Sequence, residues 1–133
     1  MAATHLSRAA FERLQAEHPG VRLDIAEAQG TELDAMLDSG AVDLAILFRY
    51  QRPSAREEKA LCVASTYLVS APGDPLTPPP TINFSKLKGL RLVLPRRPSH
   101  WRNALDEAAR SLGFKLEPVA EADSLTVQKE LVT

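Results

Sequence analysis

The residues best suited to bind a small molecule lie in a short basic stretch of the second half. Four polar residues directly precede a segment with helical spacing: Arg96, Arg97, Ser99 and His100. The first turn of a helix offers unpaired backbone N–H groups and a partial positive charge, which attract anions. Guanidinium groups beside those N–H groups would bind a carboxylate through paired hydrogen bonds. We therefore expect an anion site here, and the alternative is a solvated basic loop.

A second polar turn, made by Gln29, Gly30 and Thr31, precedes another expected helix. Threonine is a common helix-capping residue, so Thr31 is expected to cap this helix. A capping hydroxyl can also contact a ligand, and the turn is therefore a second candidate for ligand binding.

No set of residues suggests catalysis or metal binding. Cys62 lies in a short apolar run, where packing in a strand is a more common role than nucleophilic attack. His5, His18 and His100 lack the spacing of metal ligands or of a nucleophile and its base. Phosphate-binding glycine loops are also absent. We expect no enzyme activity, no cofactor and no metal.

The composition narrows the class of protein. The chain has 133 residues, 44% of them hydrophobic, and balances 16 basic against 17 acidic residues. This length suits one ordinary domain, and the charge balance argues against a stand-alone nucleic-acid binder. No apolar run approaches the ~18 residues that a membrane helix needs. A single cysteine fits a reducing compartment. We expect a cytoplasmic protein without membrane contact.

Apolar spacing predicts an alternation of helices and strands. Helices are expected over residues 6–17, 31–39, 84–90, 100–112 and 124–131, and strands over residues 21–25, 43–48, 61–63, 67–70, 91–94 and 114–119. Strand, helix and strand in this order predict parallel pairing.

A proline-rich stretch separates two predicted lobes. Residues 72–83 are stiff, so we assign them as a crossover between a first lobe, 1–71, and a second lobe, 84–133. Residues 20–28 and 113–122 resemble each other, and on this comparison each lobe lacks one strand. We expect a chain truncated at both ends, with open sheet edges that favour pairing with another chain.

An ordered series of segments resembles the effector-binding domain of LysR-type transcriptional regulators. The series covers nearly the whole chain and consists of residues 11–25, 37–48, 67–76, 87–98 and 121–125. One departure falls on the basic stretch, where Arg-Arg-Pro-Ser-His replaces the family's usual Ser-Arg-Pro-His-Gly.

The resemblance implies an α/β fold with two Rossmann-like lobes, a periplasmic-binding-protein-like type II architecture that is incomplete here. It implies that an anionic or aromatic effector binds between the lobes and controls transcription without chemistry. It also implies a homo-oligomer formed through the first lobe and DNA contact only through an absent N-terminal helix-turn-helix. The expected effector contacts are Gln29, Gly30, Thr31, Arg97, Ser99 and His100. The alternative is a fragment of a two-lobed solute-binding protein of a transport system, which would need an export signal or lipid anchor.

Overall fold

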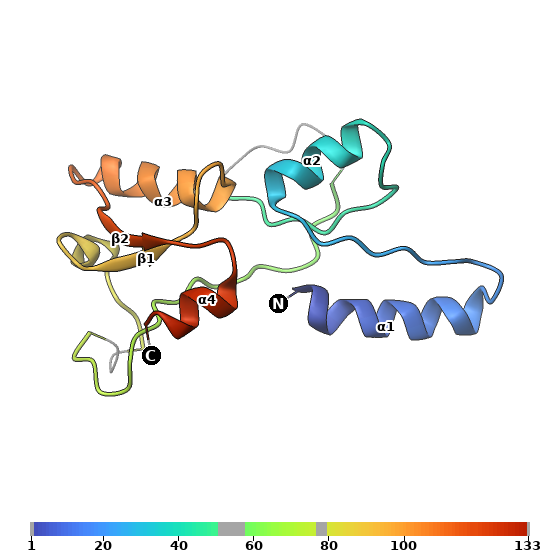
Figure 1. Cartoon of the computed structure of the whole chain (residues 1–133), viewed down its shortest axis with the longest axis horizontal. Helices are drawn as coiled ribbons and strands as arrows, with labels where there is room; N and C mark the ends of the chain where they lie inside the picture. Colours follow the sequence, from blue (N-terminus) through green and yellow to red (C-terminus); the bar gives the residue numbers. More distant parts are fainter. Residues whose placement is uncertain (1, 51–57, 77–79, 133) are drawn as a thin grey trace. The chain divides into compact units, whose positions relative to one another are not determined.

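A computed structural model describes residues 2–50, 58–76 and 80–132. The chain divides into two units, a first unit of residues 1–48 and a second unit of residues 49–133. The predicted lobe boundaries at residues 71 and 84 stay a prediction. Figure 1 shows the elements in chain order: α1 (Ala2–Glu17), α2 (Gly30–Asp38), the 3-10 helix η1 (Phe84–Leu87), β1 (Leu92–Leu94), α3 (His100–Ser111), β2 (Pro118–Glu121) and α4 (Leu125–Glu130).

The first unit contains two helices whose ends follow local rules. Helix α1 ends at Glu17, directly before His18-Pro19-Gly20, because proline cannot continue a helix. Helix α2 is followed by Gly40, whose φ of 71° a residue with a side chain rarely adopts. Both helices confirm the sequence prediction.

The predicted strands on either side of α2 are wrong. Residues 21–25 and 43–48 are extended or irregular and belong to no ladder in the described chain. Their apolar side chains stay in solvent, with Ile25, Leu44 and Phe48 exposed by 55%, 77% and 55%. A strand needs a partner for its backbone groups and a buried face for its apolar side chains, and neither is present within this unit.

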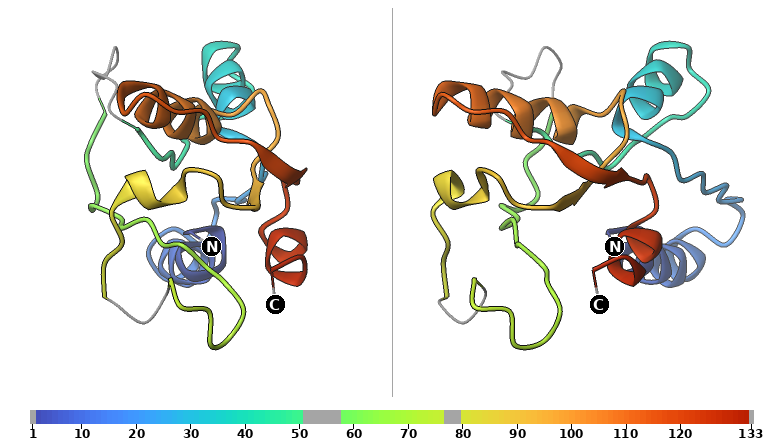
Figure 2. Two further views of the ribbon diagram at one scale, coloured as in Figure 1. Left: turned by 90° about the vertical axis from the view of Figure 1, so that its left-hand side faces the viewer. Right: turned by 60° about the vertical axis from the view of Figure 1, so that its left-hand side comes forward.

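The second unit is built on a parallel strand pair. Strand β1 pairs with β2, with Leu92 opposite Pro118 and Leu94 opposite Glu121. Helix α3 connects the two strands, as parallel pairing requires a long crossover. Two further views show α3 and α4 on opposite sides of this pair (Figure 2).

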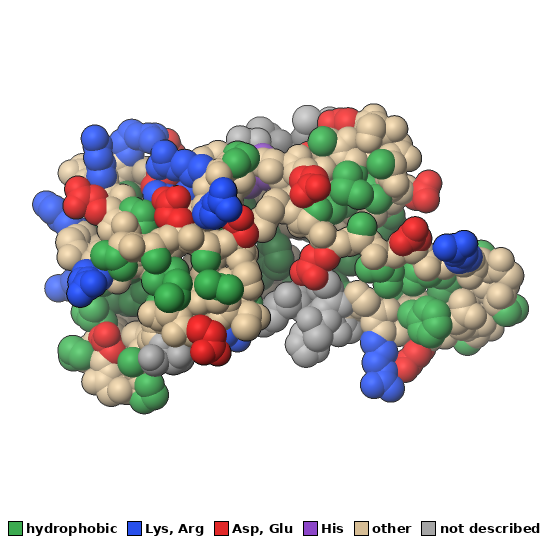
Figure 3. Space-filling model, in the orientation of Figure 1, with side chains coloured by type: hydrophobic (Ala, Val, Ile, Leu, Met, Phe, Trp, Pro, Cys, Tyr) green, Lys and Arg blue, Asp and Glu red, His purple; other side chains and the backbone are tan. Residues whose placement is uncertain are grey.

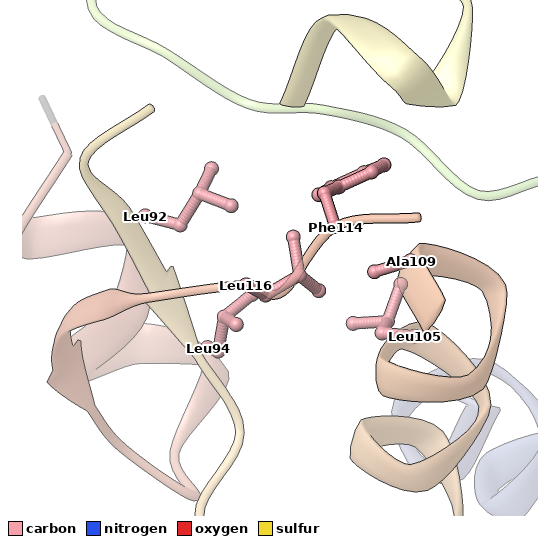
Figure 4. Packing of buried hydrophobic residues seen from close by; sticks show 6 residues of the cluster. All are labelled: Leu92, Leu94, Leu105, Ala109, Phe114 and Leu116. Carbon is pink, nitrogen blue, oxygen red and sulfur yellow. The ribbon is translucent and has the colours of Figure 1, made fainter. Parts of the chain in front are cut away.

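Six apolar side chains form the core of the second unit, and none is more than 9% exposed. They come from β1, from one face of α3 and from the segment that leads into β2 (Figure 4): Leu92, Leu94, Leu105, Ala109, Phe114 and Leu116. Full burial of such a side chain stabilises a fold by roughly 1.5–3 kcal/mol. This cluster therefore fixes α3 on the strand pair.

Other predictions in the second unit need correction. The strand expected over 114–119 pairs only from Pro118 onward, and the helix expected over 84–90 is a single 3-10 turn. Residues 61–63 and 67–70 form no strand, because no described segment pairs with them. Cys62 is consequently exposed and does not pack as predicted.

Candidate functional site

The loop of residues 95–99 lies between the carboxyl end of β1 and the first turn of α3. Ser99 is the N-terminal capping residue of α3, and its backbone is extended with φ −149° and ψ 128°. Its Oγ accepts a hydrogen bond from the backbone N–H of Arg102 at 3.3 Å. The predicted candidate Ser99 is thus 8% exposed and satisfies one of the unpaired N–H groups of the helix.

Behind this loop, the guanidinium of Arg102 joins three segments of the chain. Its Nη1 donates to the backbone oxygen of Pro95 at 3.2 Å and to Oε1 of Glu121 at 2.5 Å. Its Nε donates to both carboxylate oxygens of Asp106 at 3.1 Å. The Arg102 side chain is only 4% exposed, so these contacts replace water around a buried charge.

The charged form of Arg102 is favoured despite its burial. Burial lowers the pKa of Arg102, but hydrogen bonds to Glu121 and Asp106 outweigh that effect, and the pKa lies above its ordinary value. The permanently charged guanidinium of Arg102 holds the loop of residues 95–99, α3 and β2 in contact with one another.

Asp106 is shared between this buried arginine and an exposed one. Nη2 of Arg97 lies 2.5 Å from Oδ2 of Asp106, and the two side chains are 62% and 14% exposed. Arg96 lies near Asp123, with 3.8 Å between Nη1 and Oδ2. Arg96 and Arg97, whose guanidinium groups the sequence suggests as ligand contacts, therefore each lie near a carboxylate of the same unit. A ligand carboxylate that binds Arg97 must replace Asp106 as the partner of its guanidinium group.

A hollow of about 320 Å³ lies beside Arg97 and Asp106. Asn103 and Glu107 of α3 form part of its wall. Asp106 would keep its bonds to Arg102 if Arg97 turned to a ligand in this hollow. The exposed arginine can thus change partner without leaving a carboxylate unpaired.

Two aromatic rings lie close to the same helix end. Trp101 and Tyr50 are stacked with ring centroids 4.5 Å apart and an interplanar angle of 30°. Trp101 also packs against the core cluster. Burial raises the pKa of the Tyr50 phenol above its ordinary value of 10.0. His100, the neighbour of Trp101, is half-buried.

The other predicted contacts belong to the first unit. Gln29 is the capping residue of α2, with φ −71° and ψ 152°, and its side chain makes no capping hydrogen bond. The prediction that Thr31 caps α2 is wrong, because the helix already begins at Gly30 and places Thr31 inside its first turn. The structure brings together Arg97, Ser99 and His100 in the second unit.

Sequence reasoning missed the buried arginine and its two acidic partners. Apolar spacing over residues 100–112 predicts a buried helix face made of Trp101, Ala104, Leu105, Ala108 and Leu112. Leu112 is 54% exposed instead, and Arg102 is 3% exposed. The available signal was spacing, because Arg102 lies three residues before Leu105 and four before Asp106. Its long-range bond to Glu121 left no signal in the sequence.

The described residues contain no group of three or more His, Cys, Asp or Glu side chains placed to hold a metal ion. No helix in the described ranges has the length and apolar character needed to cross a membrane.

One comparison with known proteins identified a family. The family model described as the LysR substrate binding domain matches residues 1–133. No curated protein and no solved structure matches the chain.

Proposed function

Because the chain belongs to the LysR substrate binding domain family, we propose that it is the effector-sensing part of a LysR-type transcriptional regulator. The family match across residues 1–133 is the observation that carries this proposal. Membership implies a periplasmic-binding-protein-like type II fold. The proposed effector is a small metabolite held between the two predicted lobes by non-covalent contacts, without catalysis. Its binding shifts the populations of domain arrangements and so changes transcription.

In the second predicted lobe, we assign the effector contact to Arg97 and the first turn of α3. The N-terminal end of a helix favours anions, and α3 is 12 residues long. The Arg97 side chain is 62% exposed and is therefore accessible to a ligand. An effector with a carboxylate suits this charge, and an aromatic body suits the nearby rings of Trp101 and Tyr50.

In the first predicted lobe, Gln29, Gly30 and Thr31 are the proposed effector contacts. Gln29 is exposed, and Gly30 and Thr31 are half-buried at the N-terminal end of α2. The Gln29 side chain makes no capping bond, so its amide is a suitable donor for an anionic ligand.

The proposal includes partners and a location. DNA is contacted by a helix-turn-helix domain of the regulator, and not by the residues described above. Copies associate through the first predicted lobe, where Leu6 and Phe11 of α1 are 43% and 50% exposed. Large exposed apolar side chains are typical of association surfaces. A regulator that acts on DNA in this way is expected in the cytoplasm.

The test is a thermal-shift titration of the 133-residue chain with benzoate and, separately, with succinate. At least one probe should raise the melting temperature, because a ligand that binds only the folded chain stabilises it. Arg97→Gln should weaken this binding by about tenfold, since a charge-assisted contact to a carboxylate is lost. Arg13→Gln on α1 is the matched control and should bind as the original chain does. Equal affinity in the Arg97→Gln variant would remove Arg97 from the proposed site.

A further inference from the structure

A second hollow lies at the other end of α3 and β1 from the proposed effector loop. Its volume is about 720 Å³, within the range typical of small-molecule sites. The chain lines it just before β1 begins and again where α3 ends, so it shares no residue with the loop of residues 95–99. We call it the basic hollow, after the four cationic side chains that line it: Lys88, Arg91, Arg110 and Lys115.

The basic hollow carries an excess of uncompensated positive charge. Glu117 is the single acidic residue of its lining. Arg110 pairs with Glu107, which lies outside the lining. Within the part of the chain that the structure describes, no carboxylate pairs with Lys88, Arg91 or Lys115. Figure 3 shows lysine and arginine side chains gathered at this end of the second unit.

The backbone around the basic hollow is held in place by the core of the second unit. Gly113 ends α3 with a φ of 76°, and its N–H donates to the backbone oxygen of Arg110 at 3.0 Å. Phe114 follows directly and is 8% exposed, so the backbone that carries Lys115 is held in place. Cations near a helix C-terminus also stabilise the helix dipole, which accounts for Arg110 and Lys115. That effect does not account for Lys88 and Arg91, which come from a separate segment.

We propose that the basic hollow binds a small polyanion, a molecule with two or more phosphate or carboxylate charges close together. Positively charged side chains from two segments of the chain line the same hollow. A compact polyanion can therefore contact several of them at once. Phe114 and Val119 form part of the lining and offer an apolar wall for the carbon skeleton of such a ligand. The basic hollow shares Arg110 with the smaller hollow beside Arg97, but it contains none of the residues assigned as effector contacts, and the proposal does not rest on the proposed function.

The test is calorimetric titration of the whole chain with pyrophosphate and, in a separate arm, with citrate at matched ionic strength. Arg91→Gln and Lys115→Gln should each weaken binding of the preferred probe by about two- to fivefold. Glu117→Gln removes the acidic lining residue and should tighten binding by about twofold, a gain that misfolding cannot mimic. The tighter probe identifies the ligand as a phosphate or as a polycarboxylate.

Arg13→Gln serves as the control and should leave this binding unchanged, with circular dichroism confirming the helix content of every variant. Binding of neither probe would overturn the proposal. Binding that is unaffected by Arg91→Gln and Lys115→Gln but lost in Arg97→Gln would also overturn it.

Discussion

Arg102 and Glu121 are joined by a 2.5 Å hydrogen bond from Nη1 to Oε1, although 19 residues separate them in the sequence. Glu121 lies opposite Leu94 in the strand pair, and Pro95, the next residue after Leu94, accepts a second bond from Arg102. The guanidinium thus connects the end of β1, the start of α3 and the end of β2. The loop that carries the effector candidates is shaped by this long-range contact.

Replacement of Arg102 should destabilise the second unit. Arg102→Ala leaves Asp106 and Glu121 without their buried cation, and we expect a loss of about 3 kcal/mol in the free energy of unfolding. Urea denaturation followed by Trp101 fluorescence measures this loss. Arg110→Ala removes an exposed ion pair and should change the free energy by less than about 0.5 kcal/mol. Similar losses in the two variants would contradict the role assigned to Arg102.

Asp106 should set the affinity of Arg97 for anions. Asp106→Asn removes the internal carboxylate that competes for Arg97, and an exposed pair of this kind contributes up to about 1 kcal/mol. We therefore expect benzoate to bind about two- to fivefold more tightly to the Asp106→Asn variant in a calorimetric titration. Asn103→Asp, which adds a carboxylate beside the same hollow, should weaken binding instead. A decrease in affinity in Asp106→Asn would show that Asp106 supports the site and does not compete with the ligand.

The core of the second unit provides a test within one helix. Leu105→Ala should lower the free energy of unfolding by about 2–4 kcal/mol, because it opens a cavity between α3 and the strand pair. Leu112→Ala on the same helix should cost less than about 1 kcal/mol, since that side chain is 54% exposed. The midpoint of urea denaturation distinguishes the two variants, and equal shifts would show that the buried face of α3 is wrongly placed.

The stacked pair of Tyr50 and Trp101 should respond to alkaline pH. Burial raises the pKa of Tyr50 above its ordinary value of 10.0, so the fold favours the neutral phenol. The resulting stabilisation of the fold is complete below the pKa that Tyr50 has in the unfolded chain. It is lost as the pH rises through the higher pKa of Tyr50 in the folded chain. Trp101 is the only tryptophan, and its fluorescence should change in this alkaline range.

The Tyr50→Phe variant is the control for this alkaline transition. It keeps an aromatic ring beside Trp101 but has no phenol to ionise. The fluorescence change should therefore disappear in this variant, and its persistence would assign the transition to another group.

The sequence predicts the helices well because their signals are local. Ser124 caps α4 by accepting from the backbone N–H of Val127, and Gly113 ends α3. Capping residues and helix-ending glycines act within one turn, so a single sequence is sufficient to find them.

Strands and buried charges depend on partners that are distant in the sequence. Residues 43–48 have the apolar run of a buried strand but form no ladder in the described chain, because apolar character cannot specify which segment pairs with them. The burial of Arg102 depends on Glu121 in the same way. The candidate residues Arg97, Ser99 and His100 could be placed at the start of α3. The bond from Arg97 to Asp106 and the bond from the Arg102 N–H to Ser99 required the structure.

We propose that an anionic effector binds at Arg97 and the first turn of α3. The most direct test titrates benzoate into the isotopically labelled chain and follows each backbone amide by nuclear magnetic resonance. We expect the largest chemical-shift changes on Arg97, Ser99 and His100, while Gly89 and Gly113 at the far end of α3 and β1 stay unchanged. Changes confined to the far end, or spread evenly over the second unit, would show that the effector does not bind at Arg97.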